Sequence, residues 1–205
     1  PDADIRIPVA GPFSIAQNLL GLNELMMEVA TRPDHVGRLL LRLVDGQVRF
    51  SQSVVDAGLG VAFFESAAAP PLLSPHHFRQ IELPALKRAI GEVARIVGAP
   101  APCIIGGDTT PIIPEMLETG TDFLICPAET DRVAFLDRMS AHPEVKVRVN
   151  LDPRLYTHGT RDEILAEVNR VIEVAAGREN ILLGTGAIPY ETPSENLLLI
   201  KEYVS

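Results

Sequence analysis

The sequence predicts an α/β protein whose strands form a parallel sheet. Short apolar runs typical of strands alternate six times with longer runs typical of helices, which is the pattern of repeated strand–helix crossovers. The strand runs are apolar throughout, as expected for strands covered on both faces. With 205 residues, of which 46% are hydrophobic, the chain can build a core of its own, and we predict a single domain over 1–205.

The strands and helices follow one another in a regular order. We predict strands at residues 5–10, 61–65, 102–107, 122–126, 145–150 and 180–186. We predict helical segments from 14 to about 57 with an interruption at Pro33, and then at 74–98, from about 111, and at 131–140, 152–177 and 192–204. The long helix after Pro33 carries an apolar stripe formed by Val36, Leu39, Leu40, Leu43, Val44, Val48 and Phe50.

Several helix ends have recognisable signals. Ser74 can cap a helix that has Pro75 in its first turn. Thr160 and Glu163 have the spacing of a capping box, and Gly177 marks the end of the same helical stretch. Pro193 is predicted to lie in the first turn of the last helix.

Composition and charge argue against several functional classes. The net charge is −9 and no cluster of Lys or Arg is present, so we do not expect a nucleic-acid partner. No apolar run approaches the roughly 18 residues that span a bilayer, and no basic–apolar leader is visible. The two cysteines, Cys103 and Cys126, lie in apolar surroundings, which suits a reducing compartment, and we predict a cytoplasmic protein.

The pattern of elements fits a doubly wound sheet or a barrel. The glycine fingerprint of a dinucleotide-binding fold is missing, because "GTGAIP" is not GxGxxG and follows the last strand. Five motifs then indicate a family: "GPFSIAQNLLG", "FES" with "LSP", "GGDTTPIIPEMLETGTDF", "NLDPRLYTHGTRDEI" and "ILLGTGAIPYETPSENL". In order and spacing they resemble the uroporphyrinogen decarboxylase superfamily, along essentially the whole chain.

This resemblance implies a TIM-type (β/α)8 barrel, of which the chain holds about six C-terminal units. In that fold the site lies at the carboxyl ends of the strands. We therefore expect the intact protein to be longer, or another element to fill the gap. The resemblance also implies a homodimer and a tetrapyrrole, a corrinoid or a corrinoid protein as the partner.

The decarboxylase branch of the superfamily is matched only in part. Its serine after the second predicted strand corresponds to Ser66, but its tyrosine position is Asn18 and its histidine position is Thr185. A substrate with several carboxylates needs cations, and the predicted strand ends offer only Arg148 and Arg154. The segment at residues 21–36 is short, as in the methyltransferase branch.

The zinc site of the methyltransferase branch is not matched. The resemblance places its ligands at Ile104, Gly106 and Thr185, so we do not expect zinc. Alternation turns Cys103 away from Ile104, which predicts a buried core residue. Cys126 ends its strand and could reach the site.

The candidate site residues are small polar groups and carboxylates near strand ends. Glu65, Ser66 and Asp108 are the catalytic candidates, although Asp108 could equally cap the following helix. The predicted substrate contacts are Phe13, Asn18, Phe64, Gly106, Gly107, Asn150, His158 and Thr185. His158 is expected in a loop on the side of the site.

Other polar residues have simpler explanations. His76 and His77 are expected at the surface or in a cap, and Asp152 in a turn. Glu115 and Glu195 are expected to face solvent.

Three functions remain open. The first is a corrinoid-linked methyltransferase that acts on methylcobalamin or a related corrinoid. The second is uroporphyrinogen decarboxylase, which removes acetate carboxyl groups in porphyrin biosynthesis. The third is a non-catalytic tetrapyrrole-binding or scaffold protein.

Overall fold

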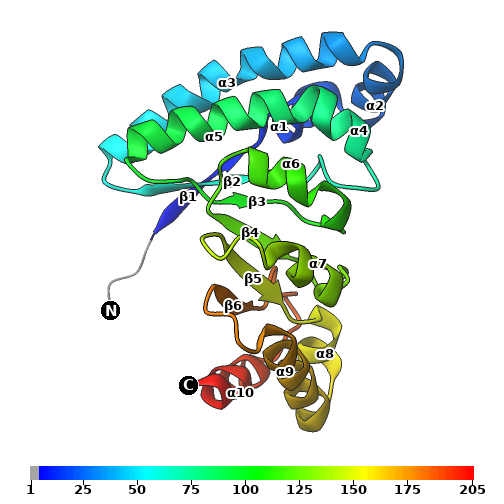
Figure 1. The fold of residues 1–205 in the computed structure, drawn as a ribbon, viewed down its shortest axis with the longest axis vertical. Coiled ribbons are helices and arrows are strands. Elements are labelled where there is room, and N and C mark those ends of the chain that lie inside the picture. Colours follow the sequence, from blue (N-terminus) through cyan, green and yellow to red (C-terminus); the bar gives the residue numbers. More distant parts are fainter. Residues whose placement is uncertain (1–4) are drawn as a thin grey trace. The chain divides into compact units, whose positions relative to one another are not determined.

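The computed structural model describes residues 5–205 and contains two compact units (Figure 1). The first unit ends at Leu124 and the second begins at Ile125. One three-stranded sheet has the order β1-β2-β3 and the other has the order β4-β5-β6. The six predicted strands are therefore all present. The single domain predicted over 1–205 stays a prediction.

The first unit alternates strands with helices as the sequence predicts. Its elements are β1 (Arg6–Ala10), α1 (Pro12–Leu20), α2 (Leu22–Thr31), α3 (Pro33–Asp56), β2 (Gly60–Phe64), α4 (Pro75–His77), the π-helix η1 (Phe78–Glu82), α5 (Leu83–Val97), β3 (Cys103–Ile104), the 3-10 helix η2 (Thr110–Ile112) and α6 (Ile113–Glu118). The long helices α3 and α5 pack side by side (Figure 1).

The second unit continues the same alternation. Its elements are β4 (Phe123–Cys126), which lies across the boundary between the units, α7 (Arg132–Met139), β5 (Lys146–Asn150), α8 (Pro153–His158), α9 (Arg161–Ala175), β6 (Ile181–Gly184) and α10 (Ser194–Val204). Helix α9 packs against both α7 and α10.

Parallel pairing brings the carboxyl ends of neighbouring strands to the same level. In the first unit Ala10 pairs with Phe64, and Phe64 pairs with Ile104. In the second unit Asn150 pairs with Gly184. The residues that follow these positions therefore collect at one edge of each sheet, where the candidate site is predicted.

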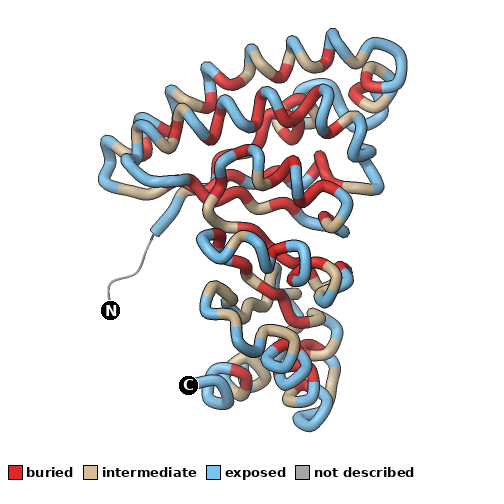
Figure 2. Tube along the Cα trace, viewed as in Figure 1, coloured by how far each residue is buried: buried red, intermediate tan, exposed pale blue. Residues whose placement is uncertain are grey.

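The buried residues of α3 follow a helical period more strictly than the predicted stripe does. Val36, Leu40 and Val44 are buried, and the next buried positions are Gln47 and Ser51. Buried and exposed positions alternate along α3 (Figure 2). Phe50 is 51% exposed, so its predicted place in the stripe is wrong. Because 3.6 residues make one turn, the buried face passes from 44 to 47 and 51 and leaves position 50 outside.

The helix signals agree with the structure, apart from the proline of the last helix. The Ser74 hydroxyl accepts a hydrogen bond from the His77 backbone N–H, and Thr160 with Glu163 forms the predicted capping box. Pro193 precedes α10 instead of lying in its first turn. Strand β3 is shorter than predicted and ends at Ile104, and the chain then turns at Gly107, where φ is +76°.

Candidate functional site

A buried carboxylate follows β2 and binds the first turn of α1. Glu65 has no exposed surface. Its Oε2 accepts a hydrogen bond from the Phe13 N–H at 3.1 Å, and its Oε1 accepts one from the Ser14 N–H at 3.0 Å and one from the Ser14 hydroxyl at 2.5 Å. A helix N-terminus favours a negative group through its free N–H groups and its dipole. Glu65 therefore fixes α1 to the end of β2.

Glu82, the last residue of the π-helix, places a second carboxyl group beside Glu65. It too has no exposed surface. Burial raises the pKa of Glu65 to about 7, and burial together with the Glu65 charge raises the pKa of Glu82 well above its usual value. Because Glu65 accepts three hydrogen bonds from α1, we assign the negative charge to Glu65 and the shared proton to Glu82.

The predicted catalytic residues occupy different environments. Glu65 is enclosed and fully engaged with α1, whereas Ser66 and Asp108 are exposed. The Asp108 Oδ1 accepts a hydrogen bond from the Thr110 N–H at 3.1 Å, which is a local turn contact. The predicted helix-capping role of Asp108 is wrong, because η2 and α6 begin without a side-chain cap. The catalytic roles of these three residues stay predictions.

The predicted substrate contacts of the first unit divide in the same way. Phe64 is 41% exposed, and Asn18, Gly106 and Gly107 are also exposed. The Phe13 side chain has no exposed surface, so the structure places it in the core and not on a surface open to substrate. Its position follows from the first turn of α1, which Glu65 holds against the sheet.

Two other predictions about the first unit have different outcomes. Cys103 is buried, as predicted, and burial raises the pKa of its thiol well above the usual value. Glu115 was expected in solvent, but it is only 2% exposed and pairs with Arg79. The expectation failed because Arg79 comes from another helix, which the local pattern around Glu115 does not show.

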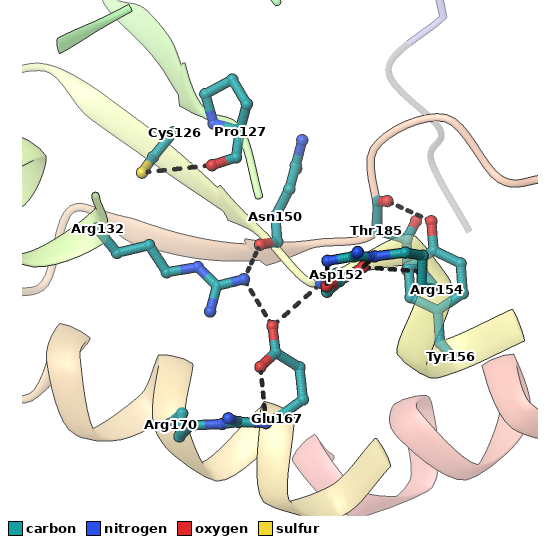
Figure 3. Close-up of polar contacts among 10 residues, drawn as sticks. All are labelled: Cys126, Pro127, Arg132, Asn150, Asp152, Arg154, Tyr156, Glu167, Arg170 and Thr185. Atoms are coloured by element: carbon teal, nitrogen blue, oxygen red, sulfur yellow. Dashed lines mark hydrogen bonds and ion pairs between the residues drawn. The ribbon is translucent and has the colours of Figure 1, made fainter. Parts of the chain in front are cut away.

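A buried ion pair fixes the end of β5 in the second unit (Figure 3). Glu167 projects from α9 and accepts hydrogen bonds from the Arg132 guanidinium at 2.6 Å and from the Asp152 N–H at 3.0 Å. The same Nη2 of Arg132 donates to the Asn150 carbonyl at 2.8 Å. Helices α7 and α9 thus determine the path of the chain where it leaves β5.

Two further contacts fix the turns beside this ion pair (Figure 3). Asp152 caps α8 through the Arg154 N–H at 2.9 Å, and the Arg154 guanidinium lowers the pKa of its carboxyl group. The Tyr156 hydroxyl lies 2.7 Å from the Thr185 carbonyl oxygen and 3.1 Å from the Ala187 carbonyl oxygen. This hydroxyl therefore holds the turn that follows β6.

Sequence reasoning did not find Arg132, Tyr156 or Glu167. A signal was present for Glu167, because it lies three residues after Ile164 and one before Val168, both of which are on the buried face of α9. A charged residue on a buried helix face requires a partner. Tyr156 and Arg132 gave no comparable signal.

The predicted contacts of the second unit lie at the ends of β5 and β6 and on α8. Asn150 is 9% exposed, and Thr185 is partly exposed. His158 is exposed but is the last residue of α8, so its predicted place in a loop is wrong. The helical stretch predicted over 152–177 is instead divided at Gly159 into α8 and α9. Cys126, at the end of β4, is fully buried.

The described residues, 5 to 205, contain neither a cluster of metal-binding side chains nor a membrane-spanning helix. Within this range no three His, Cys, Asp or Glu side chains lie close enough together to hold a metal ion. In the same range no helix combines the length and the apolar character needed to cross a membrane.

The fold and its strand-end sites define a class of protein, and comparisons with known proteins specify it further. A methyltransferase from Methanosarcina mazei has a similar structure, with a TM-score of 0.76 and 22% identity over 100% of this chain and 60% of that one. The fold is thus that of a TIM-type α/β barrel. The chain belongs to the uroporphyrinogen decarboxylase (URO-D) family, whose sequence model matches residues 7–205.

The name of one curated relative specifies a reaction, which the name of the family model does not do for this chain. The methylcobamide:CoM methyltransferase MtaA of Methanosarcina barkeri is 25% identical over 203 residues, which are 96% of this chain and 56% of the relative. The chain therefore spans less than two thirds of the length of each of these two proteins.

Proposed function

We propose that this chain is part of a corrinoid-linked methyltransferase, which transfers a methyl group between a methylated cobamide and a thiol. The observation that carries the proposal is the similarity to a methylcobamide:CoM methyltransferase along 96% of the chain. The length of segment 21–36 is a second point in its favour. A homodimer and a cytoplasmic location belong to the same proposal.

The strand ends of the first unit supply the groups for substrate contact. Ser66 and Asp108 present exposed polar groups after β2 and β3. Gly106 has open space at its Cβ position and allows a ligand to approach the backbone closely, while the Cβ position of Gly107 faces the Pro70 carbonyl at 3.1 Å. Glu65, with Glu82 beside it, supports this edge by holding the first turn of α1. Substrate binding therefore falls to the exposed groups, and positioning falls to the buried ones.

Zinc does not fit the positions that the resemblance assigns to it. Zinc in proteins is bound by thiolate, imidazole or carboxylate groups, and these positions hold Ile104, Gly106 and Thr185. These three positions therefore do not bind zinc in the proposed reaction, and other groups activate the acceptor thiol.

The proposal is tested by mixing the natural full-length protein with methylcobalamin and CoM. We expect the visible spectrum of methylcobalamin to change as its methyl group is lost, with an equal amount of methylated thiol formed. Ser66→Ala and Asp108→Asn should lower the rate, while Glu195→Gln, on the exposed surface of α10, should not. Absence of both the spectral change and the methylated product would sink the proposal.

Uroporphyrinogen decarboxylase is the second candidate, supported by the family match and by Ser66. It requires release of carbon dioxide from uroporphyrinogen, which the same protein preparation can be assayed for. A corrinoid titration that saturates without any turnover would instead support a binding protein without catalytic activity.

A further inference from the structure

Arg148 places a cation on one face of the second sheet, close to the carboxyl end of β5. Residues alternate along a strand, so Arg148 and Asn150 share a face while Val147 and Val149 share the other. Val147 and Val149 have no exposed surface and pack in the core. The opposite face is more open, because Leu182, which pairs with Arg148 in β6, is 45% exposed.

Arg148 differs from the other arginines near this end of the sheet. Arg132 is paired with Glu167, and Arg154 is paired with Asp152. Between residues 5 and 205 no carboxylate pairs with Arg148, although its side chain is partly buried and burial lowers its pKa. A partly buried guanidinium without a counter-charge is unfavourable until an anion reaches it.

The hydrogen-bond donors of Arg148 and Asn150 are arranged as a pair. The Arg148 Nε donates to the Asn150 Oδ1 at 3.2 Å, which fixes the guanidinium beside the amide. The two Nη groups of Arg148 and the Nδ2 of Asn150 have no acceptor within the described chain. Several N–H donors held side by side are the arrangement that binds a carboxylate, sulfonate or phosphate.

Two glycines make room for these side chains. A Cβ at Gly184 would lie 2.5 Å from the Arg148 Cδ, so the arginine crosses β6 only because position 184 lacks a side chain. A Cβ at Gly186 would lie 2.9 Å from the Asn150 Nδ2. The turn after β6 is itself held by the Tyr156 hydroxyl. The donors therefore lie on a rigid support.

We propose that Arg148 and Asn150 bind the oxyanion of a small acidic ligand, with Gly184 and Gly186 providing the space. The ligand presents at least two oxygens of one anionic group to the guanidinium, and one of them also accepts from the Asn150 amide. This site does not depend on the proposed methyl transfer, because its evidence is the unpaired cation, the donor pair and the glycines.

The site is tested by calorimetric titration of the full-length protein with ethanesulfonate, acetate and inorganic phosphate, and with ethanol as the neutral control. We expect saturable binding of at least one anion and none of ethanol. Arg148→Met should weaken that binding by about tenfold or more, since it removes a charge-assisted hydrogen-bond donor. Arg148→Lys should weaken it less, because the charge remains.

Two further variants serve as controls for the role of Arg148 in anion binding. Arg154→Met removes an exposed arginine that is already paired with Asp152, so it should leave anion binding unchanged. Asn150→Asp should abolish binding by giving Arg148 a fixed counter-charge, and circular dichroism should show that it folds. No saturable binding, or equal binding by the wild type and Arg148→Met, would overturn the proposal. The titrations contain no cobamide, so their outcome is separate from that of the methyl-transfer assay.

Discussion

Glu65 and Glu82 are two acidic residues whose environment changes their chemistry. The N-terminus of α1 stabilises the charge on Glu65, while Glu82 lies in the interior beside that charge. The pKa values of both carboxyl groups are raised in the folded state from the ordinary value of 4.5. Above that pH the unfolded chain has lost these protons, while the folded protein still keeps them. The free energy of unfolding therefore falls as the pH rises from that value through about 7.

Replacing Glu82 with Gln should remove much of this pH dependence. Gln stays neutral, as the protonated carboxyl group of Glu82 does, and places an N–H donor beside Glu65. We expect Glu82→Gln to match the wild type in urea unfolding near about pH 5 and to exceed it near about pH 8. Glu195→Gln, at an exposed position, should follow the wild-type profile. A Glu82→Gln variant that loses more stability at the higher pH would contradict the assigned proton.

Gly11 is required because Glu65 occupies the space beside it. A Cβ at position 11 would lie 1.9 Å from the Glu65 Oε2, and three hydrogen bonds prevent that carboxylate from moving away. Gly11→Ala should lower the free energy of unfolding by about 1–3 kcal/mol.

A helical glycine without neighbours provides the control. Gly91, within α5, has open space around its Cβ position. Gly91→Ala should stabilise the protein by about 0.5–1 kcal/mol. Thermal or urea unfolding compares the two variants, and equal effects would show that the Glu65 carboxylate can move.

Arg132 and Arg170 pair with the same carboxylate in different surroundings. The Arg132 side chain is 16% exposed and that of Arg170 is 59% exposed, while both reach Glu167. Arg132→Met leaves Glu167 in the interior with weaker compensation and should cost about 3 kcal/mol. Arg170→Met should cost less than about 1 kcal/mol. Urea unfolding measures both, and similar losses would disprove the distinction by burial.

At the scale of elements, caps determine where helices begin. The Thr160 hydroxyl accepts from the Glu163 N–H, and the Glu163 carboxylate accepts from the Thr160 N–H at 2.7 Å. Thr160→Ala should therefore destabilise the protein by about 1 kcal/mol. Ser53→Ala, at an exposed position inside α3, should change stability by less than about 0.5 kcal/mol, since Ala suits a helix interior. Thermal unfolding that shows equal losses would contradict this difference.

The elements were predictable from sequence because their signals are local. A strand needs a short apolar run, and a cap such as Ser74 or Thr160 needs a residue a few positions away. One error arises because the deciding partner is distant in the sequence, and another because the phase of a helix was misjudged. Glu115 is buried because Arg79 pairs with it, and Phe50 is exposed because the helix phase, not hydrophobicity, selects the buried position.

At the scale of the whole molecule, each sheet has one central strand. Among the residues described, β2 pairs with β1 and β3, and β5 pairs with β4 and β6, whereas β6 pairs with β5 only. Amides bonded on both sides of a strand open less readily. Hydrogen exchange of the 205-residue chain should therefore be slower in Lys146–Asn150 than in Ile181–Gly184.

Dilution provides the control for this exchange experiment. If the two strands exchange equally slowly at high concentration and β6 speeds up on dilution, a second molecule covers the β6 edge. Equal protection at every concentration would contradict the prediction.

The candidate site was less predictable than the fold. The sequence placed Ser66, Asp108 and Asn150 at strand ends. The structure finds Asn150 at the end of β5 and Ser66 just after β2, whereas β3 already ends at Ile104, before Asp108. It did not show that Glu65 is enclosed, because that depends on Ser14, about fifty residues earlier, and on Glu82. The sequence also did not show that the missing side chain at Gly184 leaves space for the Arg148 side chain. Such relations arise only when strands are paired.

The π-helix at Phe78–Glu82 has a consequence for how this protein can change by insertion and deletion. The Leu83 N–H donates to the Phe78 carbonyl, five residues back, so this turn holds one residue more than an α-turn. Losing one codon here would restore ordinary α-helical bonding. It would also rotate the residues after the turn relative to those before it by about 100° about the helix axis. In related genes, the presence or absence of this extra residue would therefore indicate whether an acidic side chain at the position of Glu82 faces the one at the position of Glu65.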